Sequence, residues 1–400
     1  MKHLFVIFLF LILQSCSESK ISLNADEIAQ DSLILDSHID VPYRLWSQHL
    51  EGLEIDDISG PTNGDFDFIR ARKGGLNVPF FSIYLPASTE EDGTSHKMAN
   101  DLIDMVEDIV TLYPEKFLLI KSVDDLSSLT NKNIVGIALG MENGAPIQGD
   151  LSRVEYYYDR GIRYITLTHS KTNHISDSSY DENIQWHGLS EFGKTLIEEM
   201  NKVGLMIDIS HVNDEAFYQA IELSQVPVIA SHSSLRHFTP GFERNVDDVM
   251  LNKLAEKGGV LQINFGSSFI SQRPRDYMDL MNNFLELKFG QSREGVSEEV
   301  INEARKEFFS KNKYPYATLD EVLDHFDRVV NLVGVDHVGI GSDYDGVGDT
   351  LPIGLKDVSS YPSLIEGFLE RGYSREDIDK ILGGNLIRVW KEVEEYANRN

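Results

Sequence analysis

Short apolar runs alternate with amphipathic stretches along most of the chain. Apolar residues spaced three to four positions apart, as in Leu102, Met105 and Ile109, predict helices between these runs. One such helix has Ser190 as a predicted N-cap and Gly204 as a predicted stop. Eight runs are predicted to be strands, at residues 32–38, 77–85, 134–139, 163–168, 205–210, 227–231, 259–265 and 337–342. Strands alternating with helices indicate a parallel sheet, and eight units predict an α/β fold closed into a (β/α)8 TIM barrel.

Two predicted connections are longer than an ordinary barrel loop. Residues 45–73 follow the first strand, and residues 266–318 follow the seventh and include a charged helical pattern at 297–311. Long insertions after barrel strands commonly form the walls of active sites. We therefore expect one barrel domain over residues 31–400, with long βα insertions after strands 1 and 7.

The first residues have the pattern of an export signal. A basic start precedes ten apolar residues at 4–13, a run too short to span a bilayer but suited to a signal-peptide core. After two further residues, Gln14 and the small residue Ser15, comes Cys16, the sole cysteine; this order resembles a bacterial lipobox. We predict a signal peptide at 1–15, an acylated Cys16 and a tether at 16–30, which would make the protein a membrane-anchored lipoprotein of the bacterial cell envelope, facing the periplasm or the cell surface. The alternative is an ordinary secretory signal or membrane anchor with a chance cysteine.

Composition narrows the functional classes. A hydrophobic content of 41% is that of an ordinary globular protein. The formal net charge of −29 argues against nucleic acid as a partner, because its phosphates would be repelled.

Metal-capable side chains recur where the predicted strands end. His38 and Asp40 close the first strand, and the two-residue period of a strand puts them on the same face. The third to sixth strands and the eighth strand are followed by Glu142, His169, His211, His232 and Asp343. All strand C-termini of a barrel converge on one mouth. Since buried charges are costly unless paired or metal-bound, this set predicts a metal site.

Imidazoles and carboxylates without a thiolate suit Zn²⁺, with Mn²⁺ or Co²⁺ as plausible substitutes. The set exceeds what one ion requires, which favours two ions sharing a carboxylate. Asp208 alternates away from His211 and is expected to make a structural hydrogen bond instead. Other histidines are not expected to be ligands, namely His187, His237, His325 and His337.

Seven segments together resemble the membrane (renal-type) dipeptidase family, zinc peptidases of the amidohydrolase-like barrels. They occur in the family's order over roughly residues 32 to 395, and they are Asp36-Ser37-His38-Ile39-Asp40, Gly140-Met141-Glu142-Asn143, Tyr164-Ile165-Thr166-Leu167-Thr168-His169, Ile207-Asp208-Ile209-Ser210-His211, Ser231-His232-Ser233-Ser234, Arg244-Asn245-Val246 and Gly341-Ser342-Asp343-Tyr344-Asp345-Gly346. The resemblance implies a zinc-dependent dipeptidase that cleaves small dipeptides, L,D-dipeptides among the candidates, by attack of a metal-bridging water.

The resemblance also implies the metal ligands. His38 and Asp40 would hold one zinc ion, and His211 and His232 the other. Glu142 would bridge both ions and thereby take part in catalysis.

Further roles follow from the same resemblance. His169 would contact the substrate and stabilise the oxyanion, and Asp343 would shuttle a proton to the leaving amine. Arg244 would pair with the free carboxylate of the substrate, a task for which its planar fork is suited. Asn245 beside it and Tyr43 after the first strand are further substrate-binding candidates. A homodimer is common in the family.

Two positions depart from the family's pattern. Relatives often carry an aromatic residue after the Asn264-Phe265 pair, where it helps to hold the substrate carboxylate, but this chain has Gly266. Tyr43 stands where the family often has Trp. Both changes touch the pocket and spare every predicted metal ligand. The alternatives to a dipeptidase are another binuclear metallohydrolase, acting on a lactone, cyclic amide or phosphoester, and a non-catalytic peptide-binding lipoprotein.

Overall fold

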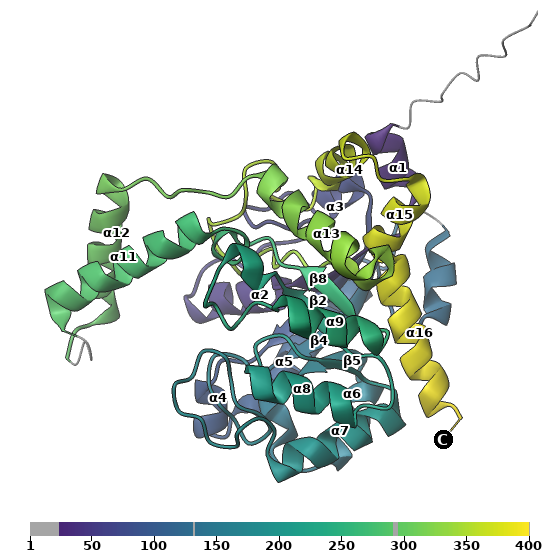
Figure 1. Cartoon of the computed structure of the whole chain (residues 1–400), viewed down its shortest axis with the longest axis horizontal. Helices are drawn as coiled ribbons and strands as arrows, with labels where there is room; N and C mark the ends of the chain where they lie inside the picture. The colour runs from purple at the N-terminus through teal and green to yellow at the C-terminus, as the bar shows by residue number, and fades with distance from the viewer. Residues whose placement is uncertain (1–23, 131–132, 291–294, 400) are drawn as a thin grey trace, which may run out of the picture.

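A computed structural model describes residues 24–130, 133–290 and 295–399 (Figure 1). The predicted signal peptide and Cys16 lie outside these residues. Among the helices that are described, each is too short or too polar to cross a bilayer.

Eight parallel strands form a nearly closed barrel, as predicted, and each overlaps one predicted strand. Nearly all of their residues are buried, as expected for a parallel sheet covered by helices. In spatial order the strands are β1 (Ile34–Ile39), β2 (Leu76–Tyr84), β4 (Val135–Glu142), β5 (Ile162–Thr166), β6 (Met206–Asp208), β7 (Ile229–Ser233), β8 (Val260–Ile263) and β9 (Val338–Ile340).

The barrel closes between β1 and the residues that follow β9. The backbone N–H of Asp343 donates to the carbonyl of His38 at 3.0 Å, and that of Asp40 donates to the carbonyl of Tyr344 at 2.9 Å. These two bonds bring the first and last strand ends together at the rim. They also set His38 and Asp40 beside Asp343.

A further strand, β3 (Phe117–Leu119), was not predicted. It lies off the barrel path and pairs with the start of β4 at Val135. Its apolar run, Phe117 to Ile120, has only four residues between two lysines, whereas the predicted runs that contain β6 and β9 have six residues each.

Helices surround the barrel (Figure 1). The predicted caps of α7 are confirmed, because the Ser190 side chain accepts a hydrogen bond from the Gly193 N–H and Gly204 ends the helix with φ 94°. The α-helices are α1 (Ala25–Asp31), α2 (Val41–Leu50), α3 (Phe68–Gly74), α4 (Ser88–Glu91), α5 (Ser95–Leu112), α6 (Ser152–Asp159), α7 (Glu191–Val203), α8 (Asp214–Leu223), α9 (Asp248–Glu256), α10 (Ser267–Ile270), α11 (Gln272–Phe289), α12 (Glu298–Lys311), α13 (Leu319–Val333), α14 (Tyr361–Glu370), α15 (Arg375–Asp379) and α16 (Asn385–Ala397).

A column of rings links the base of the barrel to its mouth. Trp390 of α16 contacts Phe80 with ring centroids 5.3 Å apart, and Phe80 stacks on Tyr164 at 5.7 Å. Tyr164 in turn lies 6.5 Å from His38, whose ring stacks on His232 at 3.7 Å. The packed interior therefore supports the polar residues of the rim directly.

The long insertions after strands 1 and 7 of the prediction are present. The second contains α11 and α12, which project away from the barrel (Figure 1) and have a small core of their own that includes Tyr277, Leu285 and Phe308. A third long connection, residues 167–190 between β5 and α7, was not predicted.

The packed part of the chain begins earlier than the expected boundary at residue 31. Helix α1 lies within the segment assigned to the tether, and its Ile28 and Ala29 are buried in the main core. The expected tether at 16–30 is thus wrong for its last residues, because apolar burial holds them against the barrel.

Candidate active site

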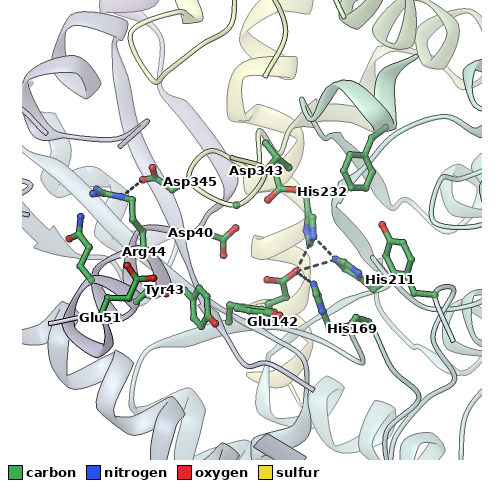
Figure 2. A pocket seen from close by; sticks show the side chains of 18 residues that line it. Asp40, Tyr43, Arg44, Glu51, Glu142, His169, His211, His232, Asp343 and Asp345 are labelled. Atoms are coloured by element: carbon green, nitrogen blue, oxygen red, sulfur yellow. Dashed lines mark hydrogen bonds and ion pairs between the residues drawn. The ribbon is translucent and has the colours of Figure 1, made fainter. Parts of the chain in front are cut away.

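The predicted metal ligands meet around Glu142 at the end of β4. Its Oε1 lies 3.1 Å from Nε2 of His211, 3.2 Å from Nε2 of His232 and 3.5 Å from Nε2 of His169 (Figure 2). Its Oε2 lies 3.4 Å from Nε2 of His38. One carboxylate therefore contacts imidazoles from four different strand ends.

Two further carboxylates complete the cluster. Oδ2 of Asp40 lies 3.5 Å from Nε2 of His38. A side chain at Gly346 would meet Asp40 and Asp343 at 2.2 Å each, so both acids converge on this glycine. In the described residues, three overlapping groups have ligand atoms close enough to share an ion: His38 with Glu142 and His232, Glu142 with His169 and His211, and His38 with Asp40 and Asp343.

Unusual backbone conformations help to aim two of these side chains. His211 and Asp343 have φ of 70° and 64°, the left-handed region that residues other than glycine rarely adopt. Each lies three residues beyond the end of its strand, β6 for His211 and β9 for Asp343, where a turn of the backbone redirects the side chain. Strained residues of this kind concentrate at functional sites.

A hydrogen-bond chain sets the tautomer of His38. The Tyr164 hydroxyl donates to the carbonyl of Ser37 at 3.0 Å, so it must accept from Nδ1–H of His38, 2.8 Å away. In the neutral ring Nε2 of His38 then presents its lone pair to the cluster, and it is buried without a hydrogen-bond partner. Without a metal ion, burial is outweighed by the nearby Tyr164, Glu142 and Asp40, which raise the pKa of His38, so a divalent cation would take the place of the proton on Nε2. Gly140 makes room for this arrangement, because a Cβ there would lie 1.9 Å from the Tyr164 ring.

A second chain sets the tautomer of His232. The hydroxyl of Ser231 donates to Asp208 at 2.6 Å and therefore accepts from Nδ1–H of His232 at 2.7 Å. The prediction that Asp208 makes structural hydrogen bonds is confirmed, since it also accepts from the Thr166 hydroxyl. Nε2 of His232 then presents its lone pair to the cluster, 2.8 Å from Nε2 of His211 and 3.2 Å from Oε1 of Glu142.

The charge states also fit a divalent cation. Burial lowers the pKa of His211 and His232 well below the usual range, so both imidazoles are neutral. Burial opposes ionisation of Glu142, but neighbouring His38 and His169 outweigh it and hold its pKa well below the ordinary value. Neutral imidazoles and ionised carboxylates are the donors that zinc binds.

Asp343 differs from Glu142 because its pKa is raised and not lowered. Burial, and then the nearby charge of Asp40, raise its pKa to about 7. Its Oδ2 accepts a hydrogen bond from the Asn264 amide at 2.6 Å. A carboxyl group with a pKa near neutrality can both accept and return a proton.

A cavity of about 680 Å³ opens above the cluster. Its walls include Tyr43 from α2 and His169, both predicted to contact substrate. Tyr84 packs between them, with ring centroids 4.7 Å from Tyr43 and 4.8 Å from His169. A volume of this size is typical of small-molecule sites.

Arg244 is 3% exposed and is not among the residues that line the cavity, but its guanidinium lies 5.5 Å from the ring of Phe269, which does line it. Its guanidinium donates to the Ser233 hydroxyl at 2.5 Å and to the His232 carbonyl at 2.7 Å, while its Nε is buried without a partner. Within the described chain no carboxylate forms an ion pair with Arg244. A buried cation without a counter-ion is costly, which favours binding of an anion there.

Asn245, like Arg244, is not among the residues that line the cavity, and its role in substrate binding stays a prediction. It is completely buried. Its amide donates to Phe269 and Thr239 and accepts from the N–H of Ser234. Its hydrogen bonds hold the segment that carries Phe269.

Two tyrosines are among the cavity residues that were not predicted from the sequence. Tyr84 ends β2, so the same attention to strand ends could have found it. Tyr180 lies in the 167–190 connection, which has no periodic pattern to mark it. The histidines not expected to be ligands lie outside the three ligand groups of the described residues, namely His187, His237, His325 and His337.

A (β/α)8 barrel whose rim gathers imidazoles and carboxylates defines a metal-dependent hydrolase. The sequence model of membrane dipeptidase (peptidase family M19) matches residues 23–400, and the chain belongs to this family. It is therefore a metallodipeptidase.

Individual relatives agree with this placement. An uncharacterized dipeptidase, C965.12, of Schizosaccharomyces pombe is 33% identical over 386 residues, covering 93% of this chain and 83% of the relative. The structure of the probable dipeptidase PvdM from Pseudomonas aeruginosa superposes with a TM-score of 0.80 at 27% identity, covering 93% and 98% of the two chains. A metallo peptidase from Rhodobacter sphaeroides, solved with a phosphinate mimic of the dipeptide L-Ala-D-Ala, has the same fold, with a TM-score of 0.73 at 22% identity over 91% of this chain and all of that one.

Proposed function

We propose that the protein is a zinc-dependent dipeptidase with two metal ions sharing Glu142. His38 and Asp40 would hold one ion, and His211 and His232 the other. The observation that carries the proposal is the overlap of the ligand groups: two of the three share Glu142, and the third shares His38. The Nδ1 hydrogen bonds of His38 and His232 leave Nε2 of each ring facing the cluster. Mn²⁺ and Co²⁺ accept the same ligands. Such a metal pair polarises a carbonyl group and lowers the pKa of a coordinated water.

The residues of the chain would divide the remaining tasks. Arg244 has no anionic partner in the described chain, so it is suited to bind the terminal carboxylate of a peptide. Asp343, with a pKa near 7, accepts a proton as the peptide bond is attacked and returns it to the leaving amine. His169 lines the cavity beside Glu142, where it can donate a hydrogen bond to the developing oxyanion.

A panel of substrates tests the proposal. Purified, zinc-loaded protein is incubated with L,L- and L,D-dipeptides, with L-Ala-D-Ala among them because a metallo peptidase of the same fold binds its phosphinate mimic. Release of free amino acids is measured. We expect turnover of dipeptides with a free carboxylate.

Two results would replace the proposal. Turnover of lactones, cyclic amides or phosphoesters with none of dipeptides would favour another binuclear metallohydrolase. Metal-loaded protein that binds dipeptides without cleaving any of them would favour a peptide-binding lipoprotein.

We also propose that acylation of Cys16 tethers the enzyme to a membrane of the bacterial cell envelope. The support is the apolar run at 4–13 followed by the sole cysteine. Incorporation of labelled fatty acid that is lost in Cys16→Ser would support the tether, and equal labelling of both proteins would exclude it. The homodimer stays a prediction, which light scattering of the purified protein would test.

A further inference from the structure

The 167–190 connection is a rigid loop built around a buried acid. Asp177, which is fully buried, accepts hydrogen bonds from the backbone N–H groups of Gln185, Trp186 and Gly188 at 2.9 to 3.1 Å. Several backbone donors on one carboxylate fix the path of a loop that has no helix or strand of its own.

The same loop is tied to the strand ends that carry the cluster. The Ser178 hydroxyl donates to the carbonyl of His169 at 2.5 Å. Ser179 donates to the carbonyl of His211 twice, from its N–H at 2.8 Å and from its hydroxyl at 2.9 Å. Tyr180 follows directly, and its N–H donates to the Ser178 hydroxyl at 3.1 Å. The position of Tyr180 relative to His169 and His211 is therefore set by the backbone.

Tyr180 faces the cavity from this fixed position. It lines the cavity wall, its ring centroid lies 5.9 Å from that of His211, and 41% of its surface is exposed. In the described part of the chain its hydroxyl has no hydrogen-bond partner. A tyrosine hydroxyl is protonated near neutral pH and can donate in a hydrogen bond.

Gly266, the residue after Phe265, has no side chain and therefore supplies no side-chain hydrogen-bond donor near Arg244. A side chain at Gly266 would approach Phe269 within 2.8 Å and Val347 within 2.9 Å, so those residues occupy the space instead. The Phe269 ring lies 5.5 Å from the Arg244 guanidinium and supplies an apolar surface. A carboxylate bound there has unsatisfied lone pairs unless another residue donates.

We propose that Tyr180 is a substrate-binding residue whose hydroxyl donates a hydrogen bond to the terminal carboxylate of the peptide, beside Arg244. The inference rests on the proposed dipeptidase function and names a second donor for the same ligand group. Through Tyr180, the 167–190 connection would select substrates that have a free carboxyl terminus.

The test uses Tyr180→Phe, which removes only the hydroxyl. Its control is Tyr156→Phe, since Tyr156 is 40% exposed and lies on α6, outside the residues that line the cavity. Each zinc-loaded protein is assayed with a dipeptide and with the same dipeptide as its C-terminal carboxamide. Because a hydrogen bond to a charged group is lost, we expect kcat/KM for the free acid to fall about tenfold or more in Tyr180→Phe, mainly through KM. The carboxamide and the control variant should show no comparable loss.

Three outcomes overturn the inference: no loss with the free acid, an equal loss with both substrates, or a loss confined to kcat, which would place the hydroxyl at the reacting carbonyl. Binding is measured in parallel by calorimetry, with each tyrosine variant made in an Asp343→Asn background. If the parent protein cleaves no dipeptide, the proposed function fails. The inference on Tyr180 is then still decided by whether its loss weakens binding of the free acid alone.

Discussion

Replacing Tyr164 by Phe should weaken zinc binding and lower the stability of the protein, although Tyr164 is not itself a predicted metal ligand. The ring would keep its packing against Phe80, but two hydrogen bonds would be lost, from Nδ1–H of His38 and to the carbonyl of Ser37. Both partners are fully buried, so neither gains a water in exchange. The proton on His38 would no longer be held on Nδ1, which removes the reason for Nε2 to present its lone pair.

The magnitude follows from those two contacts. Each buried group left without a partner costs about 1–3 kcal/mol, so the loss of two partners should lower the unfolding free energy of the metal-free protein by about 2–6 kcal/mol. Residues that orient a metal-binding histidine typically contribute about 10- to 100-fold to metal affinity, so zinc affinity should fall by that factor.

The assay separates these two effects. Zinc affinity is measured by competition with a chelator of known affinity, and stability by urea unfolding of the metal-free protein, since bound metal would add to the apparent stability. The matched control is Tyr157→Phe, another buried tyrosine whose hydroxyl bonds a histidine, Nδ1 of His96, at 2.7 Å, away from the cluster. The control should lose stability and keep its zinc affinity. Equal zinc affinity in Tyr164→Phe and the control would refute the tautomer argument.

Three further predictions concern the metals and Asp343. Exhaustive chelation should abolish dipeptide hydrolysis and added Zn²⁺ should restore it; activity that survives chelation would exclude the proposed mechanism. Asp343→Asn should retain the metal content of the parent while turnover falls by about 10²- to 10⁴-fold, and near-normal turnover would remove Asp343 from the proton transfer. In the metal-free protein the pKa of Asp343 is raised from an ordinary 3.8 to about 7, so the folded state holds an extra proton in this window and stability should fall as pH rises from about 4 to 7. Urea midpoints measured across this window should fall less steeply in Asp343→Asn; an unchanged slope would contradict the assignment.

Much of the barrel could be predicted because its strands carry local signals. Apolar runs, helical spacing and the caps of α7 all depend on neighbours within a few positions, so Ser190 and Gly204 could be assigned from the sequence alone. Strand β3 and helix α1 could not be predicted. The strand lies in an apolar run of only four residues, Phe117 to Ile120, and the helix is held by burial against the barrel.

The candidate ligands were predictable for a topological reason. Every barrel strand ends at the same mouth, so chemistry-bearing residues at strand ends come together however far apart they lie in the chain. That reasoning does not extend to Asn245 or Tyr180, which lie in connections between strands. The first is buried and the second lines the cavity because of hydrogen bonds that no local pattern reveals.

The sequence by itself determined the class of fold, the membership of the family and the set of residues able to bind metal. Only the tertiary structure decided which nitrogen of His38 and His232 faces the cluster, why Arg244 lacks an anion, and where Tyr180 lies. The physical reason is the distance along the chain over which each feature is determined. Periodicity and strand ends depend on near neighbours, whereas tautomers, pKa values and cavity walls depend on contacts such as that between positions 38 and 164, which exist only once the barrel has closed.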